Sequence, residues 1–395
     1  MANLIDVVKV AEALETKNVF VADSRCVVVR NRNVHCRKCQ EACPVDAFTI
    51  KGNTLEIHHS ACIGCGACTT ICPTEALIPL RPFDEDLTKT VADACIHYGG
   101  KAVFACARIA SKRLADSDDF AEVACLSRVE ESILVELAAQ GIEDITLVDG
   151  ICSTCKYRHN DSAIQATVDS ANLLIETMGS PIRVTRRSGF PDDMFIGDQT
   201  NRYGVSRRGF FSQTRDTAKD AAGKTVTTVF LGKNDTKAPT VRERLGMSET
   251  GMLPQFGADR RIHILDAMDR LGKPQVDTID TRLWGNVCID IDACTSCNMC
   301  AIFCPTGALR KVDEETLEII NDGRDEGSEP LAAALEFSMA DCVQCRTCQD
   351  ICLKKCLTLD SVISTHELFD FEPRFIALNE PPQKSKLFGK KTTKK

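Results

Sequence analysis

The sequence predicts a multidomain chain that is α+β at both ends and α/β in the middle. A length of 395 residues is enough for two or three domains. The 23 cysteines gather mainly in two regions near the ends, whereas residues 101–187 alternate short apolar strands with amphipathic helices. We therefore expect two cysteine-rich modules on either side of a parallel sheet that helices cover on both faces.

Composition narrows the function before any motif is read. The formal net charge is −8, from 48 basic and 56 acidic residues, which argues against a protein built to grip nucleic acid. We find neither a secretory signal at residues 1–10 nor an apolar stretch long enough to span a membrane. A cytoplasmic protein is expected, and disulfides are rare in that reducing compartment. Metal ligation then becomes the leading explanation for the cysteines.

The cysteine spacing indicates which metal. The pattern C-x2-C-x2-C-x3-C-P occurs at residues 62–73 and again at 294–305, and a third copy at 342–352 has Leu353 in place of proline. A fourth copy is partial, with Cys36, Cys39 and Cys43-Pro44. This is the bacterial ferredoxin run, in which three thiolates hold one [4Fe–4S] cluster and the fourth reaches the neighbouring cluster. Structural zinc instead uses paired C-x2-C units separated by longer gaps, so zinc is the weaker alternative.

The first pair of runs predicts an N-terminal two-cluster ferredoxin-like module over residues 1–90. Following the crossover rule, one cluster takes Cys62, Cys65, Cys68 and Cys43. Its partner takes Cys36, Cys39 and Cys72 but lacks a fourth ligand, because Asn33 occupies the expected position. We favour Cys26 as the substitute. The alternatives are a three-iron cluster, with Cys26 a buried thiol, or ligation by His35.

The second pair of runs predicts a C-terminal two-cluster ferredoxin-like module over residues 284–372. One cluster takes Cys294, Cys297, Cys300 and Cys352, and the other takes Cys342, Cys345, Cys348 and Cys304. The long acidic connection at 310–339 is expected to be a surface insertion. Cys288 and Cys356 fall outside the pattern, and we interpret them as packed or loop thiols.

The middle of the chain, 95–188, predicts a different kind of domain. Strands are expected at 102–106, 121–126, 145–148 and 182–185, with helices at 127–140 and 163–178. Ligands of such sheets gather at the carboxyl ends of strands, where Cys106, Cys125, Cys152 and Cys155 follow in turn. Four converging thiols indicate a further metal site. The alternative is four unrelated core cysteines, and Cys95 is a weaker candidate ligand.

A family resemblance bears on this domain. The segments Ala124-Cys125-Leu126-Ser127-Arg128-Val129-Glu130 and 150–160, with the helix between them, resemble the delta subunit of methyl-viologen-reducing hydrogenase. The resemblance covers about residues 100–180 and implies a flavodoxin-like sheet carrying a [2Fe–2S] cluster. It also implies electron transfer from a hydrogenase or formate dehydrogenase to heterodisulfide reductase. The chain departs from the family in the short interval between Cys152 and Cys155 and lacks the family's histidine and Gly-Asp there.

Three segments invite functional interpretations that we set aside. A string at 218–225 resembles a phosphate-binding loop, but its first glycine is alanine and a strand follows rather than precedes it. Residues 206–211 resemble a twin-arginine export motif far from the N-terminus, and we expect them to anchor a helix within a linker or partner-docking region at 189–283. The tail at 373–395 is lysine-rich and is expected to be solvated or to make a peripheral membrane contact.

No catalytic constellation is visible, so we expect an electron carrier rather than an enzyme with its own active site. The cofactor set predicted is four [4Fe–4S] clusters and one additional cluster of the [2Fe–2S] type. The expected partners are redox subunits of flavoprotein, hydrogenase or formate dehydrogenase type in an anaerobic oxidoreductase complex, and soluble ferredoxin. The rival hypotheses are an accessory protein that delivers clusters to a metalloenzyme and a redox sensor that uses the leftover thiols.

Overall fold

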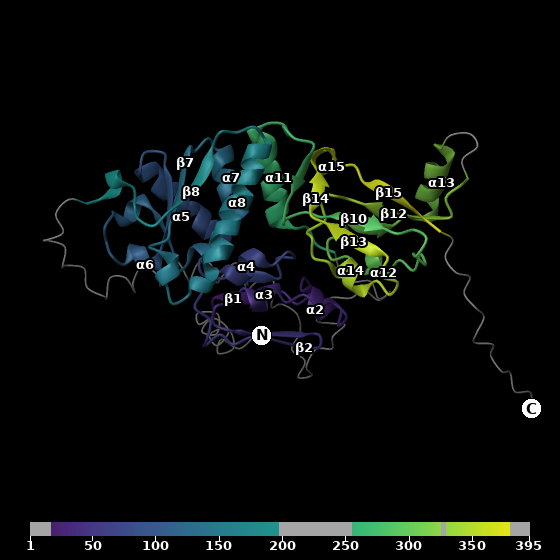
Figure 1. The fold of residues 1–395 in the computed structure, drawn as a ribbon, viewed down its shortest axis with the longest axis horizontal. Helices are drawn as coiled ribbons and strands as arrows, with labels where there is room; N and C mark the ends of the chain where they lie inside the picture. Colours follow the sequence, from purple (N-terminus) through teal and green to yellow (C-terminus); the bar gives the residue numbers. More distant parts are fainter. Residues whose placement is uncertain (1–16, 197–254, 325–328, 380–395) are drawn as a thin grey trace, which may run out of the picture.

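The computed structural model describes residues 17–196, 255–324 and 329–379. The predictions made for residues 206–211, 218–225 and the lysine-rich end of the tail lie outside these ranges. The beginning of the expected tail is instead folded, because residues 374–378 form a strand that pairs with residues 333–337. None of the described helices is both long enough and apolar enough to cross a membrane. The central α/β part and the C-terminal part lie side by side, and the N-terminal part lies against both of them (Figure 1).

The N-terminal part is built from very short elements that hold cysteine-bearing loops. Two antiparallel pairs, β1 with β4 and β2 with β3, frame these loops, and the turns of α3 and α4 follow the cysteine runs. The element bounds are β1 (Val19–Val21), α2 (Val27–Arg30), α3 (Lys38–Glu41), β2 (Phe48–Lys51), β3 (Thr54–Ile57), α4 (Ala67–Ile71) and β4 (Leu77–Pro79).

The central part is a four-stranded parallel sheet in the order β6-β5-β7-β8. The inner strand β5 is a continuous apolar run that is buried at every position, whereas the edge strand β8 carries three arginines and is partly exposed. The bounds are α5 (Asp84–His97), β5 (Ala102–Cys106), α6 (Ala107–Ala110), β6 (Ala121–Val123), α7 (Glu131–Ala139), β7 (Asp144–Val148), α8 (Asp161–Thr177) and β8 (Arg183–Arg187). Short 3₁₀ turns lie between them: η1 (Ser117–Asp119), η2 (Leu126–Arg128), η3 (Cys152–Thr154), η4 (Arg158–Asn160) and η5 (Asp192–Met194).

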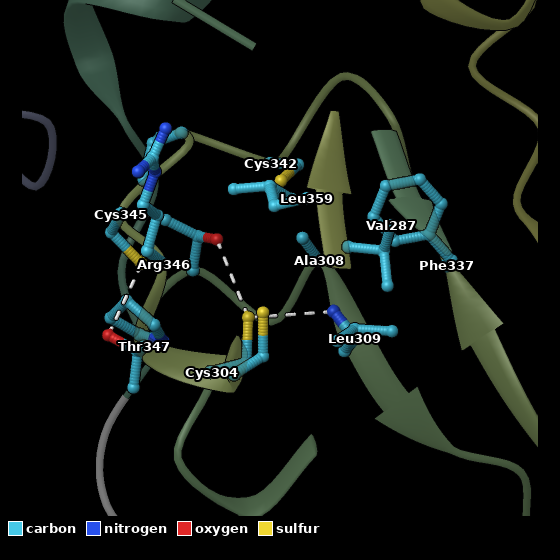
Figure 2. A pocket seen from close by; sticks show the side chains of 14 residues that line it. Val287, Cys304, Ala308, Leu309, Phe337, Cys342, Cys345, Arg346, Thr347 and Leu359 are labelled. Carbon is cyan, nitrogen blue, oxygen red and sulfur yellow. Dashed lines mark hydrogen bonds between the residues drawn. The ribbon is translucent and has the colours of Figure 1, made fainter. Parts of the chain in front are cut away.

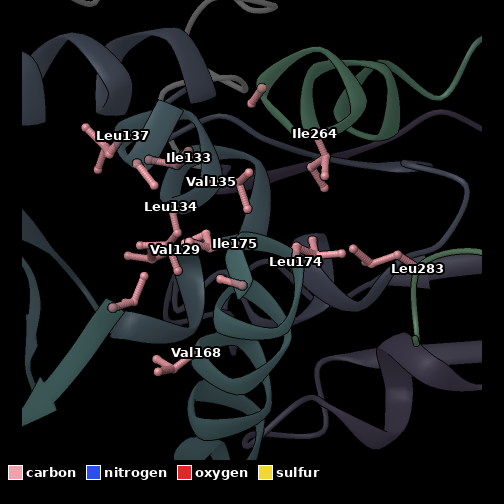
Figure 3. Packing of buried hydrophobic residues seen from close by; sticks show 14 of the residues in the cluster. Val129, Ile133, Leu134, Val135, Leu137, Val168, Leu174, Ile175, Ile264 and Leu283 are labelled. Atoms are coloured by element: carbon pink, nitrogen blue, oxygen red, sulfur yellow. The ribbon is translucent and has the colours of Figure 1, made fainter. Parts of the chain in front are cut away.

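One helix differs from the expectation for the linker. Helix α11 (Asp259–Leu271) falls within 189–283, yet it packs on α7, and its Ile264 and Leu265 are buried in the same core as Leu134 and Leu174. Figure 3 shows Ile264 beside the side chains of α7 and α8. Strand β9 (Thr278–Asp280) also pairs with a C-terminal strand, so this end of the range belongs to the folded body.

The C-terminal part repeats the plan of the N-terminal part. Strand β10 pairs with β13 as β1 pairs with β4, and β11 pairs with β12 as β2 pairs with β3. The acidic insertion is the exposed helix α13 between β11 and β12, so part of the range 310–339 is buried strand. The bounds are β10 (Asn286–Ile289), α12 (Met299–Ile302), β11 (Leu309–Lys311), α13 (Glu314–Asp322), β12 (Ala333–Phe337), α14 (Thr347–Ile351), β13 (Leu357–Asp360), β14 (Val362–Ser364), α15 (Thr365–Phe369) and β15 (Arg374–Leu378).

Candidate metal centres

The loops of the three complete cysteine runs share one backbone shape. In each run the two residues that flank the second cysteine have positive φ. These residues are Gly64 and Gly66, Ser296 and Asn298, and Gln344 and Arg346. Such turns point successive backbone N–H groups toward one centre, which suits an anionic iron–sulfur cluster. In the partial run, Arg37 has a φ of −131°, so the chain takes a different path where the first cysteine is missing.

In the N-terminal part, the thiols that the spacing assigns to one cluster influence one another. Burial raises the pKa of the Cys68 thiol well above its usual value, and the charges of Cys65, Cys62, Cys39 and Cys43 raise it further. We call Cys43, Cys62, Cys65 and Cys68 quartet 1. Thus the structure brings Cys43 from the partial run to the three cysteines of the complete run.

A second group forms beside it and includes the residue that the spacing left uncertain. Burial raises the pKa of Cys39, and Cys72, Cys26 and Cys36 add to the effect. Cys26 is buried at the start of α2, where burial raises its pKa to about 11 and the charges of Cys72 and Cys36 contribute. We call Cys26, Cys36, Cys39 and Cys72 quartet 2.

In the C-terminal part, the cavity between β10, β11, α14 and β13 is lined by Cys304, Cys342, Cys345 and Cys348, here called quartet 3 (Figure 2). Burial raises the pKa of Cys342 to about 12 and that of Cys345 to about 11. The sulfur of Cys304 accepts a hydrogen bond from the Leu309 backbone N–H at 3.5 Å. A buried hollow ringed by four thiols is the form that a cluster site requires.

Quartet 4 comprises Cys294, Cys297, Cys300 and Cys352. Burial raises the pKa of Cys300 to about 12, with contributions from Cys297 and Cys294. The structure adds a thiol that lies outside the predicted pattern. The Sγ of Cys356 lies 3.4 Å from that of Cys352, and the Cys294 thiol is among the groups that raise the pKa of Cys356. By contrast, Cys288 is exposed, and Cys95 is buried on α5.

The spacing of the thiols within the quartets separates a cluster from a single ion. A tetrahedral zinc ion needs sulfur atoms roughly 3.8 Å apart. In the part of the chain that the structure describes, no three thiols of a quartet have sulfurs that all lie within 4.8 Å of one another. A wider arrangement fits a cluster in which each iron takes one thiolate. The thiol donors, the N–H-rich turns and the cavity together fit [4Fe–4S] clusters.

The central cysteines lie at one edge of the sheet. Cys106 ends β5, Cys125 follows β6, and Cys152 and Cys155 lie in the loop after β7. Burial raises the pKa of Cys152 to about 12, and among the smaller effects are the charges of Asp149 and Cys125. Cys125 also contributes to the raised pKa of Cys106. Cys106, Cys125 and Cys152 therefore lie near one another. The Cys155 sulfur accepts a hydrogen bond from the Tyr157 backbone N–H at 3.4 Å.

Asp149, Cys152 and Asp161 also have donor atoms within 4.8 Å of one another. Arg186 pairs with both carboxylates, at 2.7 Å from Asp149, and it lowers the pKa of Cys152 against the effect of burial. The two acidic groups are therefore neutralised by a side chain of the protein. We assign this cluster of residues to the support of Cys152 rather than to a separate cation site.

The central group and quartet 1 meet across a close junction. Ser127 donates a hydrogen bond to the Cys65 carbonyl at 2.8 Å, and Asn160 donates to Cys125 Sγ at 3.6 Å and to Ser127 Oγ at 3.2 Å. The charge of Cys125 also raises the pKa of Cys65. A Cβ atom at Gly66 would lie 2.7 Å from the Cα atom of Arg128, so glycine permits this approach of the two backbones.

Quartets 2 and 3 meet across the junction between the N-terminal and C-terminal parts. The His35 backbone N–H donates to Asp350 Oδ2 at 2.9 Å, and the charge of Cys36 adds to the raised pKa of Cys345. Ile351 is buried in the same apolar cluster as Val27 and Phe48 of the N-terminal part. Within each module the two quartets also influence each other. The charge of Cys39 raises the pKa of Cys68, and the charge of Cys300 raises the pKa of Cys348.

Comparisons with known proteins agree with this geometry. A family model described as a 4Fe-4S dicluster domain matches residues 32–76, and one described as a 4Fe-4S binding domain matches residues 291–307. The chain therefore contains two ferredoxin-type 4Fe-4S domains, and it has an iron–sulfur electron-transfer role. The predicted iron–sulfur and ferredoxin character is confirmed at this level.

Individual relatives resemble short parts of the chain. It is 46% identical to a ferredoxin of Saccharopolyspora erythraea over 58 residues, 15% of this chain and 50% of that protein. It is 39% identical over 44 residues to a subunit of the ion-translocating oxidoreductase complex of Methanosarcina acetivorans, 11% of this chain and 17% of that protein. A hydrogenase-4 component of Escherichia coli is 36% identical over 45 residues, 11% of this chain and 22% of that protein. The matched region thus spans half of the ferredoxin and smaller shares of the other two proteins.

Proposed function

We propose that this protein is an electron-transfer subunit that relays single electrons along five iron–sulfur sites. Quartets 1 to 4 would each hold a [4Fe–4S] cluster, and Cys106, Cys125, Cys152 and Cys155 would hold a further cluster of the [2Fe–2S] type. Bound clusters of these types supply one-electron redox centres. The chain supplies their order, their burial and the hydrogen bonds to their sulfur ligands.

The observation that carries the proposal is the unbroken succession of thiol groups. The central group adjoins quartet 1 through Cys125 and Cys65, and quartet 1 adjoins quartet 2 through Cys68 and Cys39. Quartet 2 then adjoins quartet 3 through Cys36 and Cys345, and quartet 3 adjoins quartet 4 through Cys348 and Cys300. The N-terminal module thus connects the other two parts, although its sequence precedes both.

The two ends of this series suit exchange with partners. At one end, Cys152 and Cys155 lie half-buried in a surface loop, beside the exposed side chain of Ile151. At the other end, Cys297 of quartet 4 is exposed. The cysteines of quartets 1 to 3 are buried or half-buried, so exposure distinguishes quartet 4, while the central group is proposed as the other end by its place in the series. Electrons would therefore enter and leave at the central domain and at quartet 4.

The partners are proposed from the central domain and from the relatives. The strand order β6-β5-β7-β8 corresponds to 2-1-3-4 in chain order, as at the start of a flavodoxin-like sheet. This order supports the resemblance to the delta subunit of methyl-viologen-reducing hydrogenase and a hydrogenase, formate dehydrogenase or flavoprotein as one partner. Two relatives are named as components of larger oxidoreductases, which supports a role within a multi-subunit oxidoreductase complex.

Anaerobic affinity purification from the native organism tests this function. We expect about eighteen irons per chain, from four four-iron clusters and one two-iron cluster. We also expect stoichiometric recovery of a subunit that carries flavin, nickel or molybdenum. Recovery of the protein alone with substoichiometric, labile iron would contradict the relay and favour the accessory or sensor role.

A further inference from the structure

The four segments that carry the last cysteine of each run differ at one buried position. Proline follows Cys43, Cys72 and Cys304, but exposed Leu353 follows Cys352. Four residues after the cysteine, three of the runs have alanine, at Ala47, Ala76 and Ala308. The remaining run has Cys356 at that position.

The backbone places these four residues in the same way. The residue before each has a positive φ: 49° at Asp46, 51° at Glu75, 75° at Gly307 and 52° at Lys355. The alanines are almost fully buried, and Cys356 is only 9% exposed. Ala308 lines the cavity of quartet 3, as Figure 2 shows. The equivalent Cβ of Cys356 therefore carries a thiol toward quartet 4.

Quartet 4 consequently has five thiols for four irons. The Sγ atoms of Cys352 and Cys356 are 3.4 Å apart. Two sulfur atoms 3.4 Å apart are too close to bind two different irons of one cluster, so only one of them can be the ligand at a given time. Both sulfurs are thus positioned for the same corner of a cluster.

We propose that Cys352 and Cys356 are alternative ligands of one iron of the cluster at quartet 4. In the exchange, the bond from iron to Cys352 Sγ breaks as a bond to Cys356 Sγ forms. The proton of the incoming thiol passes to the departing thiolate, and no oxidation state changes. This inference rests on the proposed cluster at quartet 4. It gives the terminal cluster a reserve ligand that the other three quartets lack.

Alanine variants of the full chain, purified anaerobically, test this exchange. An oxidised three-iron cluster gives an electron paramagnetic resonance signal, whereas an oxidised four-iron cluster is silent. We expect Cys352→Ala and Cys356→Ala each to retain wild-type iron and to gain no three-iron signal. The double variant should lose iron and gain about one three-iron spin per chain.

Quartet 3 provides a matched control, because Ala308 stands where Cys356 stands in the other run. Cys304→Ala should gain the three-iron signal by itself. Adding Ala308→Cys in that background should abolish the signal by restoring a fourth thiolate. This result would tie the effect to the position four residues after the missing ligand.

Two results would overturn the exchange while leaving the relay intact. If wild-type protein holds about eighteen irons but Cys352→Ala gives the signal of the double variant, Cys356 is not a ligand. If Cys356→Ala alone gives that signal, Cys352 is not a ligand. Wild-type protein without four-iron clusters would overturn both the proposed function and this inference.

Discussion

At the scale of the residue, Cys26 is the position whose role depends most on the fold. It lies ten residues before the partial run, and the structure places it with Cys36, Cys39 and Cys72. Its start-of-helix position on α2 holds the thiol buried beside this group. We interpret Cys26 as the fourth ligand of quartet 2.

Replacing Cys26 by alanine should therefore convert one four-iron cluster to a three-iron form. The expected result is the loss of about one iron per chain and the gain of a three-iron resonance signal. Cys95→Ala is the matched control, because burial alone raises the pKa of Cys95 and no other thiol contributes. Unchanged iron and no new signal in Cys26→Ala would contradict the assignment.

Asn160 is a second residue with a specific role, at the junction between the central group and quartet 1. Its amide donates to Cys125 Sγ, and its hydrogen bonding also lowers the pKa of Cys65. Hydrogen bonds to ligand sulfur stabilise the reduced, more negative cluster. Asn160→Leu should lower the potential of the central cluster by about 40 mV, equivalent to roughly 1 kcal/mol for one electron.

A redox titration followed by electron paramagnetic resonance measures this shift. The clusters at quartets 3 and 4 serve as internal references, since Asn160 lies at the opposite junction. An equal shift at every cluster would indicate a general loss of structure rather than the loss of one hydrogen bond. No shift at the central cluster would refute the role given to Asn160.

At the scale of the element, α11 joins the central sheet to the N-terminal module. Its Arg260 pairs with Glu130 at 2.7 Å, and it donates to the Thr69 carbonyl at 2.7 Å. The Arg260 backbone N–H also donates to Glu75. Arg260 and Glu130 are both buried, so removing Arg260 leaves the Glu130 carboxylate with only the weaker support of Ser132 and Arg128.

Arg260→Met should destabilise the fold by about 3–5 kcal/mol at neutral pH. Burial already raises the pKa of Glu130 to about 7 against the opposing effect of Arg260, and the variant should raise it further. A folded-state pKa above the unfolded one costs stability as pH rises. The difference between variant and wild type should thus have a pH-dependent part that is absent near pH 5 and grows toward pH 8.

Apparent thermal midpoints at several pH values measure this effect, with the Arg260→Met/Glu130→Gln double variant as control. The double variant should recover part of the loss and lose the added pH dependence. A destabilisation of the single variant that is constant from pH 5 to pH 8 would contradict the assigned pair.

The elements also show what the sequence can predict. Strand β5 has the predicted bounds, because a fully buried apolar run has no other stable place. The sequence predicts a linker where α11 lies, because Arg260 and Arg261 are typical surface residues. They are buried here because carboxylates and carbonyls distant in sequence surround them. Local pattern cannot reveal partners that only the tertiary fold supplies.

In the candidate site, too, some features can be predicted from the local sequence and others depend on the tertiary fold. Spacing predicts three ligands of quartets 1, 3 and 4 from a single run and the fourth from the crossover rule, but it leaves the fourth ligand of quartet 2 open. Spacing alone misses Cys356, although its alignment with Ala47, Ala76 and Ala308 offers a signal. The contact of quartets 2 and 3 has no signal in the sequence, because His35 and Asp350 are joined only by packing of the two modules.

At the scale of the whole molecule, the N-terminal module is the middle of the proposed relay. The module contacts the central domain through Ser127 and the C-terminal module through Asp350. Neither outer part needs to contact the other for electrons to pass between them. The order of the sites, rather than their number alone, is the central claim.

Iron anomalous diffraction from anaerobically grown crystals of the full chain tests that claim most directly. The account predicts five iron-containing sites in one continuous series, from Cys125 through quartets 1, 2 and 3 to quartet 4. Four of them should be four-iron clusters held by the named quartets, with Cys356 beside the last. Single zinc ions, or a series broken between quartets 2 and 3, would contradict the account.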